Sequence, residues 1–561
     1  MLTNTLYFAT LLNNQVTILS KLCSEFGITH AVICPGSRSA PLVFAFNRNK
    51  NFKTYTIIDE RSAAYIALGI AQQLQKPVAL ICTSGTAAVN FYPAIAEAFY
   101  QKIPLVVLTA DRPLEMINQQ DGQMINQINL FGSHVRASMQ FSVQSSQLEV
   151  QNVLEKSTNP VLGPVHINVP LIEPLYENLI PEIELIQLET NKEKSVEFDT
   201  TKLSDAVVKS KKKIILVGQL LPNRALNKVL IALQEKGFII LADVVSNQHE
   251  NIWLKQFDLI IAQATKDTLQ ELEPDLIISL GGPVLSKALK LWLKQQQPSF
   301  HFRIQQDETL VNTYNNVTDY IFSSNILVLN SINNLSLATD SSYSELWYKI
   351  EQKSNALTKH FTISNTAVFN ELVAVDTVLD NLPSNSQLHI ANSTSIRYVS
   401  YLGVPQKQLT VFCNRGTSGI DGCSSTTIGA ALANNNITTL VTGDLALFYD
   451  RNAFWNNYVP KNLRIILLNN SGGGIFNLID GPSGTPELEQ FFLTKHHLKA
   501  KNLATDFGLI YENCTSQDEL NNALKTFFEP SDTAKIIELS FDMEASAEVY
   551  KVFRKMNIDH S

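Results

Sequence analysis

Two polar segments in the last third of the chain contain the residue types that bind a divalent cation and a phosphate. Thr442-Gly443-Asp444 follows one strand-like apolar run, and Asn469-Asn470-Ser471-Gly472 follows the next. A carboxylate, an amide oxygen and a backbone carbonyl suit Mg²⁺, which prefers oxygen ligands and completes its octahedron with phosphate and water. Each segment alone is also an ordinary turn sequence. Together, at the ends of successive strands, they favour a diphosphate–Mg²⁺ site.

A glycine-rich loop precedes these residues. It reads Gly416-Thr417-Ser418-Gly419-Ile420-Asp421-Gly422, and backbone that lacks a Cβ atom can approach a phosphate closely. We therefore expect this loop at the same site.

An acidic pair stands where another strand-like run passes into an apolar helical pattern, in Ile58-Asp59-Glu60-Arg61. Asp59 has the residue type of a helix N-cap, and a carboxylate at Glu60 interacts favourably with the helix dipole. A carboxylate in this position can also be half-buried with a shifted pKa, as acid–base groups are. We predict that Asp59 caps the helix, and a chemical role stays open for Glu60.

Alternating strands and helices must position these residues. Short β-branched runs alternate with helical periodicity along the chain, which predicts an α/β fold of doubly wound parallel sheets. Ligands gather at the carboxyl ends of such strands, where the polar segments stand. Helices are expected near 60–74 and 86–100. Strands are predicted at 29–34, 55–58, 78–82, 105–109, 213–217, 238–242, 259–262, 276–280, 387–391, 409–413, 438–442, 464–468 and 535–539.

Two polar stretches divide the chain. Residues 188–201 and 330–343 are rich in charged residues, serine and asparagine, as linkers are. The length of 561 residues suffices for three or four domains. We predict three α/β domains, at 1–190, 200–340 and 345–561.

Composition excludes several classes of protein. Apolar residues make up 45% and charged residues 17% of the chain, as in folded rather than disordered proteins. The net charge of −8 argues against a nucleic-acid or polybasic membrane-surface protein. No apolar run has the length of a membrane span, and the six cysteines are scattered without a C-x-x-C motif. We expect a cytoplasmic protein with no nucleic-acid or membrane partner.

The motifs together resemble those of the thiamine diphosphate (ThDP) enzymes. Gly443-Asp444 followed by Asn469-Asn470 is similar to their diphosphate- and metal-binding motif, and a strand-end glutamate in the first domain is their other hallmark. The resemblance implies the pyruvate-oxidase/decarboxylase-like architecture, with pyrimidine-binding, middle and diphosphate-binding domains in that order. Two further segments look like the N-terminal domain of this superfamily: Thr83-Ser84-Gly85-Thr86 with Pro93 and Glu97, and Gly163-Pro164-Val165-His166-Ile167-Asn168-Val169-Pro170.

Three segments narrow the resemblance to one family. They look like those of the SEPHCHC synthases, ThDP-dependent transferases of menaquinone biosynthesis whose product is 2-succinyl-5-enolpyruvyl-6-hydroxy-3-cyclohexene-1-carboxylate. The resemblance covers essentially the whole chain and implies decarboxylation of 2-oxoglutarate with 1,4-addition of the succinyl carbanion equivalent to isochorismate. The segments are Cys34-Pro35-Gly36-Ser37-Arg38-Ser39-Ala40-Pro41-Leu42, Asp59-Glu60-Arg61 and Asn414-Arg415-Gly416-Thr417-Ser418-Gly419-Ile420-Asp421-Gly422.

The resemblance assigns roles to the motif residues. Glu60 matches the catalytic glutamate that hydrogen-bonds the aminopyrimidine ring of ThDP. Asp444, Asn470 and the carbonyl of Gly472 match the ligands of Mg²⁺, for which Mn²⁺ can substitute, and Ile420 matches an apolar wedge beneath the cofactor. The positions that match cofactor contacts are Glu60, Gly416, Ser418, Gly419, Ile420, Gly443, Asp444, Leu445, Asn470, Gly472, Ile475 and Phe476.

Two dicarboxylic substrates need several cations on this acidic chain. Arginine suits bidentate recognition of a carboxylate better than lysine does. A single arginine is ordinarily a surface charge, but four stand at predicted strand exits or early helix turns. The resemblance implies substrate contacts at Ser37, Arg38, Arg112, Gln123, Lys287, Ser393, Arg397 and Arg415, with Ser393, Arg397 and Arg415 on the 2-oxoglutarate side.

Two positions depart from the family pattern. Some relatives carry a Lys-Arg pair where this chain has Lys287-Ala288, so one cation is missing there. Gly474 is smaller than expected beside Ile475, which predicts a looser wall.

The resemblance also bears on assembly and on the histidines. It implies a homodimer or a dimer of dimers, in which the glutamate and the diphosphate site come from different subunits. The implied reaction requires no side-chain nucleophile. His496 and His497 are therefore interpreted as a solvated pair, and His166 as a structural histidine.

Three other functions are compatible with parts of the sequence. Another ThDP decarboxylase or ligase, such as an acetohydroxyacid synthase-like enzyme, has a smaller apolar acceptor and does not need four converging arginines. A nucleotide-dependent dehydrogenase fits the alternating layers, but no G-x-G-x-x-G follows a strand, and Gly281-Gly282-Pro283 is a poor substitute. A non-catalytic protein that has kept the fold is opposed by the intact Glu60, Asp444 and Asn470.

Overall fold

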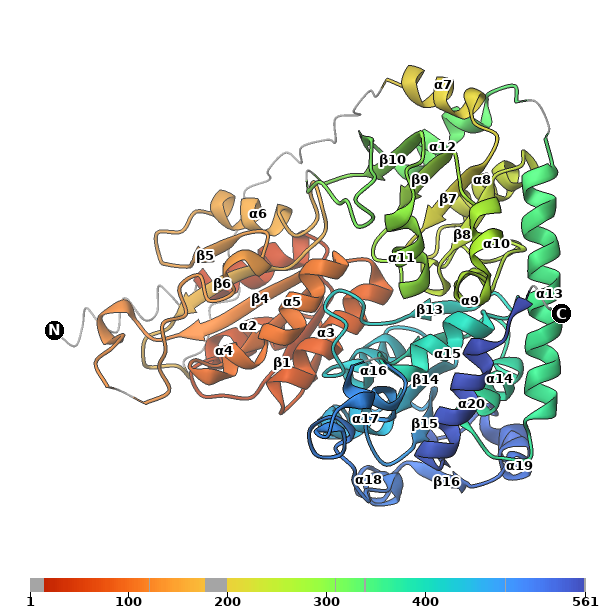
Figure 1. Ribbon diagram of the computed structural model, residues 1–561. Coiled ribbons are helices and arrows are strands. Elements are labelled where there is room, and N and C mark those ends of the chain that lie inside the picture. The colour runs from red at the N-terminus through yellow and green to blue at the C-terminus, as the bar shows by residue number, and fades with distance from the viewer. Residues whose placement is uncertain are drawn as a thin grey trace.

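Three parallel β-sheets, one after another along the chain, organise the protein (Figure 1). The computed structural model describes residues 15–120, 122–176, 199–307, 309–337, 340–479 and 481–558. The N-terminal unit lies to one side of the molecule, and the middle and C-terminal units lie one above the other in Figure 1. The fold class predicted from the alternating pattern is confirmed.

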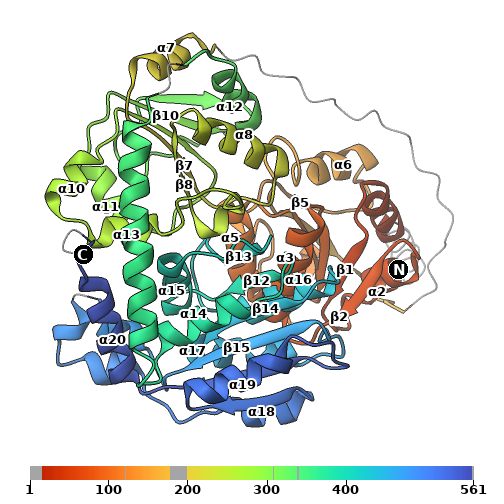
Figure 2. The ribbon, with the colours of Figure 1, turned by 90° about the vertical axis from the view of Figure 1, so that its right-hand side faces the viewer.

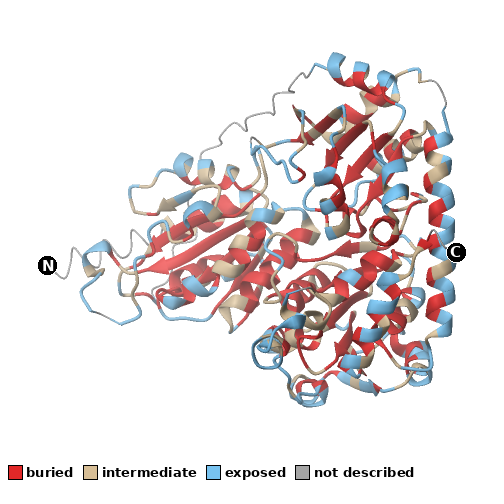
Figure 3. Ribbon diagram, in the orientation of Figure 1, coloured by how far each residue is buried: buried red, intermediate tan, exposed pale blue. Residues whose placement is uncertain are grey.

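The first sheet has six strands in the order β2-β1-β3-β4-β6-β5. Its central strands β3 and β4 are completely buried and mostly apolar, as expected where helices cover both faces of a sheet (Figure 3). The strands are β1 (His30–Ile33), β2 (Lys53–Thr56), β3 (Val78–Cys82), β4 (Leu105–Asp111), β5 (Ser138–Gln140) and β6 (Val165–Pro170), and the helices are α2 (Ala40–Arg48), α3 (Glu60–Leu74), α4 (Thr86–Asn90), α5 (Tyr92–Gln101) and α6 (Gln147–Glu155).

The last sheet repeats the strand order of the first, as β13-β12-β14-β15-β17-β16. In both sheets the order reverses between the first and the third strand, and a crevice opens at such a point beside the carboxyl ends of the strands. The strands are β12 (Gln387–Ile390), β13 (Thr410–Phe412), β14 (Thr438–Gly443), β15 (Leu463–Asn469), β16 (Ile510–Cys514) and β17 (Lys535–Ser540). The helices are α14 (Glu371–Asn381), α15 (Thr394–Leu402), α16 (Cys423–Leu432), α17 (Asp444–Tyr449), α18 (Ala500–Phe507), α19 (Gln517–Phe527) and α20 (Met543–Lys555).

The middle sheet has five strands in the order β11-β10-β9-β7-β8. The long helix α13 (Ser342–Ser364) then runs along both the middle and the C-terminal unit (Figure 2). No helix in the described parts of the chain combines the length and the apolar character of a membrane span. The strands are β7 (Lys213–Val217), β8 (Ile239–Ala242), β9 (Leu276–Leu280), β10 (Phe300–Gln305) and β11 (Asp319–Phe322), and the helices are α7 (Thr201–Lys209), α8 (Arg224–Glu235), α9 (Phe257–Gln263), α10 (Lys266–Glu271), α11 (Lys287–Gln295) and α12 (Asn325–Asn333).

The predicted strands are confirmed to within two residues at their ends, with one exception. The strand predicted at 259–262 is wrong. These residues form part of helix α9, which lies against α11, α13 and α15. A short apolar run buried on all sides has no periodicity that separates a strand from a helix. The helix expected at 86–100 is two helices, α4 and α5, and the strands β5, β6, β10, β11 and β16 were not predicted.

The linker segments fall partly outside the described residues. Of 188–201, only 199–201 are described, and α7 begins there. Of 330–343, the ends are helical, in α12 and α13. The three sheets lie within the predicted ranges 1–190, 200–340 and 345–561, whose limits stay a prediction; the limit at 345 falls inside α13.

Two close-packed helices join the first and last units within one chain. The backbones of α3 and α16 approach so closely that a Cβ atom on Gly69 or Gly429 would collide with the facing carbonyl. At the start of α3, Arg61 donates to the carbonyl oxygen of Tyr449 at 2.8 Å. This packing fixes the helix that begins with Glu60.

Asp450 is buried beneath this contact. Its carboxylate accepts hydrogen bonds from the backbone N–H and the hydroxyl of Ser425, at 2.7 and 2.8 Å. Burial raises the pKa of Asp450 from 3.8 to about 7. An unfolded chain therefore loses this proton near pH 4, whereas the folded chain keeps it until about pH 7, so stability falls as the pH rises through that window.

We expect Asp450→Asn to remove this loss of stability. The asparagine is neutral at every pH and keeps an oxygen for the Ser425 N–H. The difference in Tm between the variant and the unmodified protein should therefore rise, in favour of the variant, between pH 5 and pH 8. Thermal unfolding at both pH values measures it, with the half-exposed Asp506→Asn as a control. A difference that does not change with pH would contradict the prediction.

Candidate active site

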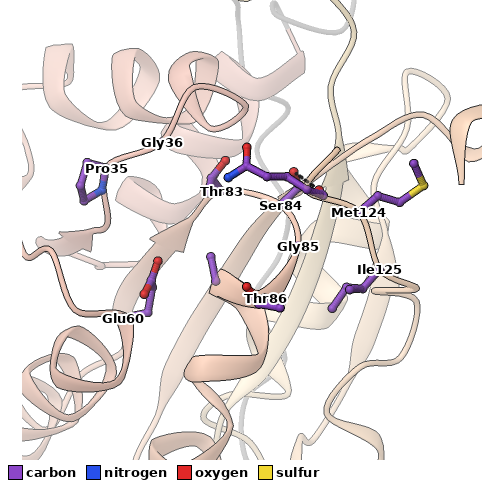
Figure 4. Close-up of a pocket in the computed structure, with 11 residues that line it drawn as sticks. Pro35, Gly36, Glu60, Thr83, Ser84, Gly85, Thr86, Met124 and Ile125 are labelled. Atoms are coloured by element: carbon purple, nitrogen blue, oxygen red, sulfur yellow. Dashed lines mark hydrogen bonds between the residues drawn. The ribbon is translucent and has the colours of Figure 1, made fainter. Parts of the chain in front are cut away.

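A pocket of about 350 Å³ lies at the carboxyl edge of the first sheet, beside the point where the strand order reverses (Figure 4). Its lining residues follow the ends of β1, β2, β3 and β4, so four loops of one sheet edge converge on it. Figure 4 shows the Glu60 carboxylate directed toward the space between Pro35 and Thr83. The lining consists of Pro35, Gly36, Glu60, Thr83, Ser84, Gly85, Thr86, Ala87, Gln123, Met124 and Ile125.

Glu60 is the first residue of α3 and is half-buried. The preceding residue, Asp59, accepts a hydrogen bond from the N–H of Ser62 at 3.0 Å, which confirms the predicted N-cap. Cys34 and Cys82 are buried, which raises the pKa of both thiols, and the negative charge of the nearby Glu60 raises it further. The Glu60 carboxylate itself faces the pocket (Figure 4).

The residues predicted to hold a cation meet at the carboxyl edge of the last sheet. Asp444 begins α17 directly after β14, and Asn470 follows β15. Both side chains are nearly buried, and both aim an oxygen at one backbone amide: Gly472 N–H lies 3.0 Å from Asp444 Oδ2 and 3.2 Å from Asn470 Oδ1. The structure thus brings together the three predicted ligand residues.

This donor set fits an oxygen-ligated divalent cation. A carboxylate and an amide oxygen converge. The backbone of Leu493 approaches Gly472 so closely that a Cβ atom on Gly472 would lie 2.5 Å from the Leu493 carbonyl oxygen. Among the described residues no cluster of three or more His, Cys, Asp or Glu side chains forms a metal site. One carboxylate with amide and carbonyl oxygens is typical of Mg²⁺ that shares its ligands with phosphate.

His496 was misjudged from the sequence. Its Nε2 lies 3.4 Å from Asp444 Oδ2, and its ring packs edge-on against Phe448. It is therefore half-buried beside the cation ligands rather than part of a solvated pair, whereas His497 is exposed as expected. The structural role of His166 is confirmed, since it is buried and bonded to Thr109 and Ser138.

The glycine loop lies close to the same edge, but part of its backbone is already bound. The N–H groups of Gly416 and Thr417 donate to the buried carboxylate of Glu97, on α5, at 2.8 and 2.6 Å. The backbone of Gly416 was expected to approach a phosphate, but it packs closely against Glu97 instead. A Cβ atom on Gly416 would lie 2.6 Å from the Glu97 carbonyl oxygen. Ser418 is exposed with φ of 65°, Gly419 is half-buried, and Ile420 packs against a small apolar cluster.

The remaining predicted cofactor positions lie around Asp444 and Asn470. The N–H of Leu445 donates to Asp444 Oδ1 at 2.7 Å. Ile475 and Phe476 belong to a short 3-10 helix, Gly474–Asn477, and the Phe476 ring lies against Phe492. The looser wall expected from Gly474 is not seen: this residue is buried, and a Cβ atom there would lie 2.6 Å from Asn470 Nδ2.

Several predicted substrate residues follow strand ends in the last unit. Arg397 donates to the carbonyl oxygen of Ser393 at 2.6 Å, and Arg415 donates to Asn392 Oδ1 at 2.8 Å. Lys287 is exposed at the start of α11. One turn further on, Lys290 is half-buried, and burial lowers its pKa, which the positive charge of Arg415 lowers further.

The other predicted substrate residues belong to the first unit. Arg38 is buried and donates to the carbonyl oxygen of Leu171 and to Glu173, both at 3.2 Å. Arg112 donates to the carbonyl oxygen of Gly122 at 2.8 Å. Gln123 lines the pocket, and Ser37 lies 3.0 Å from the Tyr176 hydroxyl.

The chain thus carries two groups of functional residues on two sheet edges. The described lining of the Glu60 pocket comes entirely from residues 35–125, and none of it from the unit that carries Asp444 and Asn470.

Sequence reasoning missed Lys290 and Glu371. Lys290 falls three residues before the buried Leu293, on the inward side of α11, and a lysine on that side was the available signal. Glu371 is completely buried and accepts a hydrogen bond from Asn470 Nδ2 at 2.6 Å. No sequence signal pointed to it, because an Asn-Glu pair at a helix start is ordinary capping chemistry.

Two family models match the chain. Residues 14–130 match "Thiamine pyrophosphate enzyme, N-terminal TPP binding domain", and residues 186–390 match "Middle domain of thiamine pyrophosphate". Most of the first match coincides with the unit that contains the Glu60 pocket.

Curated relatives match over nearly their whole length. The chain is 41% identical over 555 residues to a 2-succinyl-5-enolpyruvyl-6-hydroxy-3-cyclohexene-1-carboxylate synthase of Cytophaga hutchinsonii, covering 96% of this chain and 98% of that protein. It is 40% identical over 524 residues to the synthase of the same name from Flavobacterium psychrophilum, covering 90% and 92%. The match to the synthase from Bacteroides thetaiotaomicron is 35% over 523 residues, covering 91% and 92%.

The fold has a solved counterpart. The crystal structure of benzoylformate decarboxylase from Polynucleobacter necessarius superposes with a TM-score of 0.70 and 16% identity, covering 94% of this chain and 98% of that one. At that identity the likeness concerns the fold alone.

Proposed function

The chain belongs to the SEPHCHC synthase family of ThDP enzymes, and on that premise we propose that it decarboxylates 2-oxoglutarate and transfers the succinyl carbanion equivalent to isochorismate by 1,4-addition, in menaquinone biosynthesis. The observation that carries this proposal is that one chain contains both a pocket lined by Glu60 and a group of converging oxygen ligands. This second group consists of Asp444, Asn470 and Gly472, and we call it the cradle. Each part alone has a plainer explanation, as a capped helix start or as a turn.

The cradle would hold the diphosphate end of the cofactor through Mg²⁺, or through Mn²⁺ in its place. Asp444, Asn470 and the Gly472 carbonyl would be the protein ligands, with Gly443 and Leu445 next to them and Ser418, Gly419 and Ile420 on the glycine loop. When bound, ThDP supplies the carbon nucleophile and the electron sink for loss of CO₂. Ile475 and Phe476 add apolar surface beside the cradle, which helps to exclude water.

Glu60 would act at the other end of the cofactor. Its carboxylate faces the pocket from the start of a helix that is capped by Asp59 and packed against α16, so its position is fixed before any ligand arrives. From there it would hold a hydrogen bond to the aminopyrimidine ring and exchange a proton with it. General acid–base groups of this kind need such fixed geometry.

Cations at the strand ends would bind the substrate carboxylates. Arg397 and Arg415, with Ser393, are proposed for 2-oxoglutarate, and Arg38, Arg112 and Gln123, with Ser37, for the second substrate. Lys287 is proposed as a contact from the middle unit. The half-buried Lys290 beside Arg415 offers a cation close to the position where Ala288 lacks one.

A homodimer or a dimer of dimers would complete the site. The Glu60 pocket is lined from the first unit alone among the described residues, which supports a partner subunit that brings its Asp444–Asn470 cradle to it. The six cysteines are free thiols, which supports a reducing, cytoplasmic setting.

The proposed reaction is tested with purified protein, ThDP and Mg²⁺. We expect 2-oxoglutarate and isochorismate to be consumed together, with one CO₂ released for each product molecule. Omitting isochorismate is the control. Turnover of pyruvate but not of 2-oxoglutarate would contradict the substrate assignment.

We expect Arg397→Ala to raise KM for 2-oxoglutarate roughly 10- to 100-fold, the equivalent of one hydrogen bond to a charged group. KM for isochorismate should change much less, because this residue is assigned to the first substrate. Initial rates with each substrate varied in turn measure both constants. Arg451→Ala, which removes an arginine from a half-exposed ion pair with Asp506, is the matched control. An unchanged KM for 2-oxoglutarate would refute the contact.

A further inference from the structure

Asn470 is held by a buried carboxylate from a distant part of the chain. Its Nδ2 donates to Glu371 Oε1 at 2.6 Å, and Glu371 Oε2 accepts a second hydrogen bond from the Tyr398 hydroxyl at 2.6 Å. Glu371 and Tyr398 are both completely buried, on α14 and α15. A buried hydrogen-bonded chain thus runs from α15 through α14 to the loop after β15.

The hydrogen bonds from Tyr398 through Glu371 set which way the Asn470 amide faces. Both oxygens of Glu371 accept hydrogen bonds, Oε1 from Asn470 Nδ2 and Oε2 from the Tyr398 hydroxyl, and an accepting oxygen pairs with the NH₂ end of an amide and not with its oxygen. With its Nδ2 bound to Glu371, Asn470 keeps Oδ1 on the opposite side, where it points at the Gly472 N–H beside Asp444. A cation needs that oxygen, because an amide NH₂ group is not a ligand.

Gly474 adds a steric contribution to the same orientation. A Cβ atom at this position would lie 2.6 Å from Asn470 Nδ2. The absence of a side chain there leaves the amide room to lie against Glu371. The small residue that departs from the family pattern thus fits the position of the amide.

The neighbouring asparagine, Asn469, is also hydrogen-bonded to a buried glutamate, but its freed oxygen has a different role. Asn469 Nδ2 donates to the buried Glu538 at 2.6 Å, and Glu538 also accepts from the Tyr511 hydroxyl at 2.8 Å. The freed Asn469 Oδ1 accepts from the N–H of Ser471, which only shapes the turn. The polypeptide therefore contains a second asparagine–glutamate–tyrosine set beside the cradle, in which Glu538 also accepts from the Ala500 N–H at 2.9 Å and lies 3.5 Å from Lys499 Nζ.

We propose that Glu371 is a positioning residue for the divalent cation: it holds the Asn470 amide so that Oδ1 faces the cradle. The inference rests on the proposed function, since that function supplies the cation. Groups that orient a metal ligand typically contribute about 10- to 100-fold in metal affinity. Glu371→Gln is the informative change, because the glutamine amide can donate to Asn470 Oδ1 and so stabilise the reversed orientation.

The experiment titrates Mg²⁺ into protein with a fixed concentration of ThDP and follows binding by calorimetry, without substrate or turnover. We expect Glu371→Gln to weaken Mg²⁺ binding about 10- to 100-fold. Glu538→Gln, the same change one asparagine away, should alter it less than about threefold. Gly474→Ala displaces the same amide without touching Glu371 and should weaken Mg²⁺ in the same direction. Thermal unfolding confirms that each variant is folded.

The outcomes separate this inference from the proposed function. Unchanged Mg²⁺ affinity in Glu371→Gln, or equal losses in Glu371→Gln and Glu538→Gln, would overturn the positioning role while the function stands. If the unmodified protein bound no ThDP with Mg²⁺, the proposed function itself would fail, and the inference with it. Loss of Mg²⁺ affinity in Glu371→Gln and Gly474→Ala, but not in Glu538→Gln, would support the positioning role of Glu371.

Discussion

Replacing Glu60 by glutamine is expected to lower kcat by about 10²- to 10⁴-fold, the range that a positioned general acid–base group contributes. Glutamine has nearly the same shape, so α3 and the pocket around Pro35 and Thr83 should be retained. The amide cannot exchange a proton with the cofactor ring. Binding of ThDP with Mg²⁺ should persist, because the cradle of Asp444 and Asn470 is untouched. Single-turnover kinetics with a parallel binding titration measure both properties.

Asp59→Asn is the matched control for this variant. It removes a carboxylate from the adjacent position, and asparagine caps a helix about as well as aspartate does. It should therefore turn over at close to the unmodified rate. Undiminished activity in Glu60→Gln would remove Glu60 from its assigned role.

The second large effect is expected from Asp444→Asn. This change removes the only carboxylate among the proposed cation ligands, and carboxylates are the strongest protein ligands of Mg²⁺. Mg²⁺ affinity should fall by more than about 100-fold, beyond the range for a residue that merely orients a ligand. Turnover should be lost with the cation and return in part at high Mg²⁺ concentration. Calorimetric titration and the dependence of rate on Mg²⁺ measure the two effects.

Asp450→Asn serves as the control here, since it makes the same change directly after α17 and away from the cradle. It should keep the Mg²⁺ affinity of the unmodified protein. Normal Mg²⁺ binding by Asp444→Asn would refute the cradle.

Local patterns were enough to predict where strands end and which polar residues follow them. Asp444 and Asn470 could be placed on one sheet edge because parallel strands put their carboxyl ends together. The cap at Asp59 was predictable because it needs only a side chain and the N–H three residues on. In contrast, the secondary structure of residues 259–262 depends on the elements that surround them. The run is short and apolar, and a helix or a strand would bury it equally well.

The partners of the site residues could not be predicted in this way. Glu371 contacts Asn470 only because α14 folds against the loop after β15, and no sequence pattern in either segment predicts that contact. His496 was assigned to solvent, because sequence alone does not reveal that the chain returns to Asp444. The backbone of Gly416 was expected to lie near a phosphate, yet it holds Glu97, an anion that the chain itself supplies.

The two large-effect variants together provide the most direct test of the central claim, that one active site combines Glu60 of one subunit with the Asp444–Asn470 cradle of another. Glu60→Gln and Asp444→Asn are each expected to be nearly inactive alone. Mixed dimers of the two contain one site with both changes and one with neither, so statistical mixing should restore about a quarter of the unmodified activity. If the mixture stays as inactive as the separate variants, although mixed dimers are isolated through a different affinity tag on each variant, both groups act within one chain and the account is contradicted.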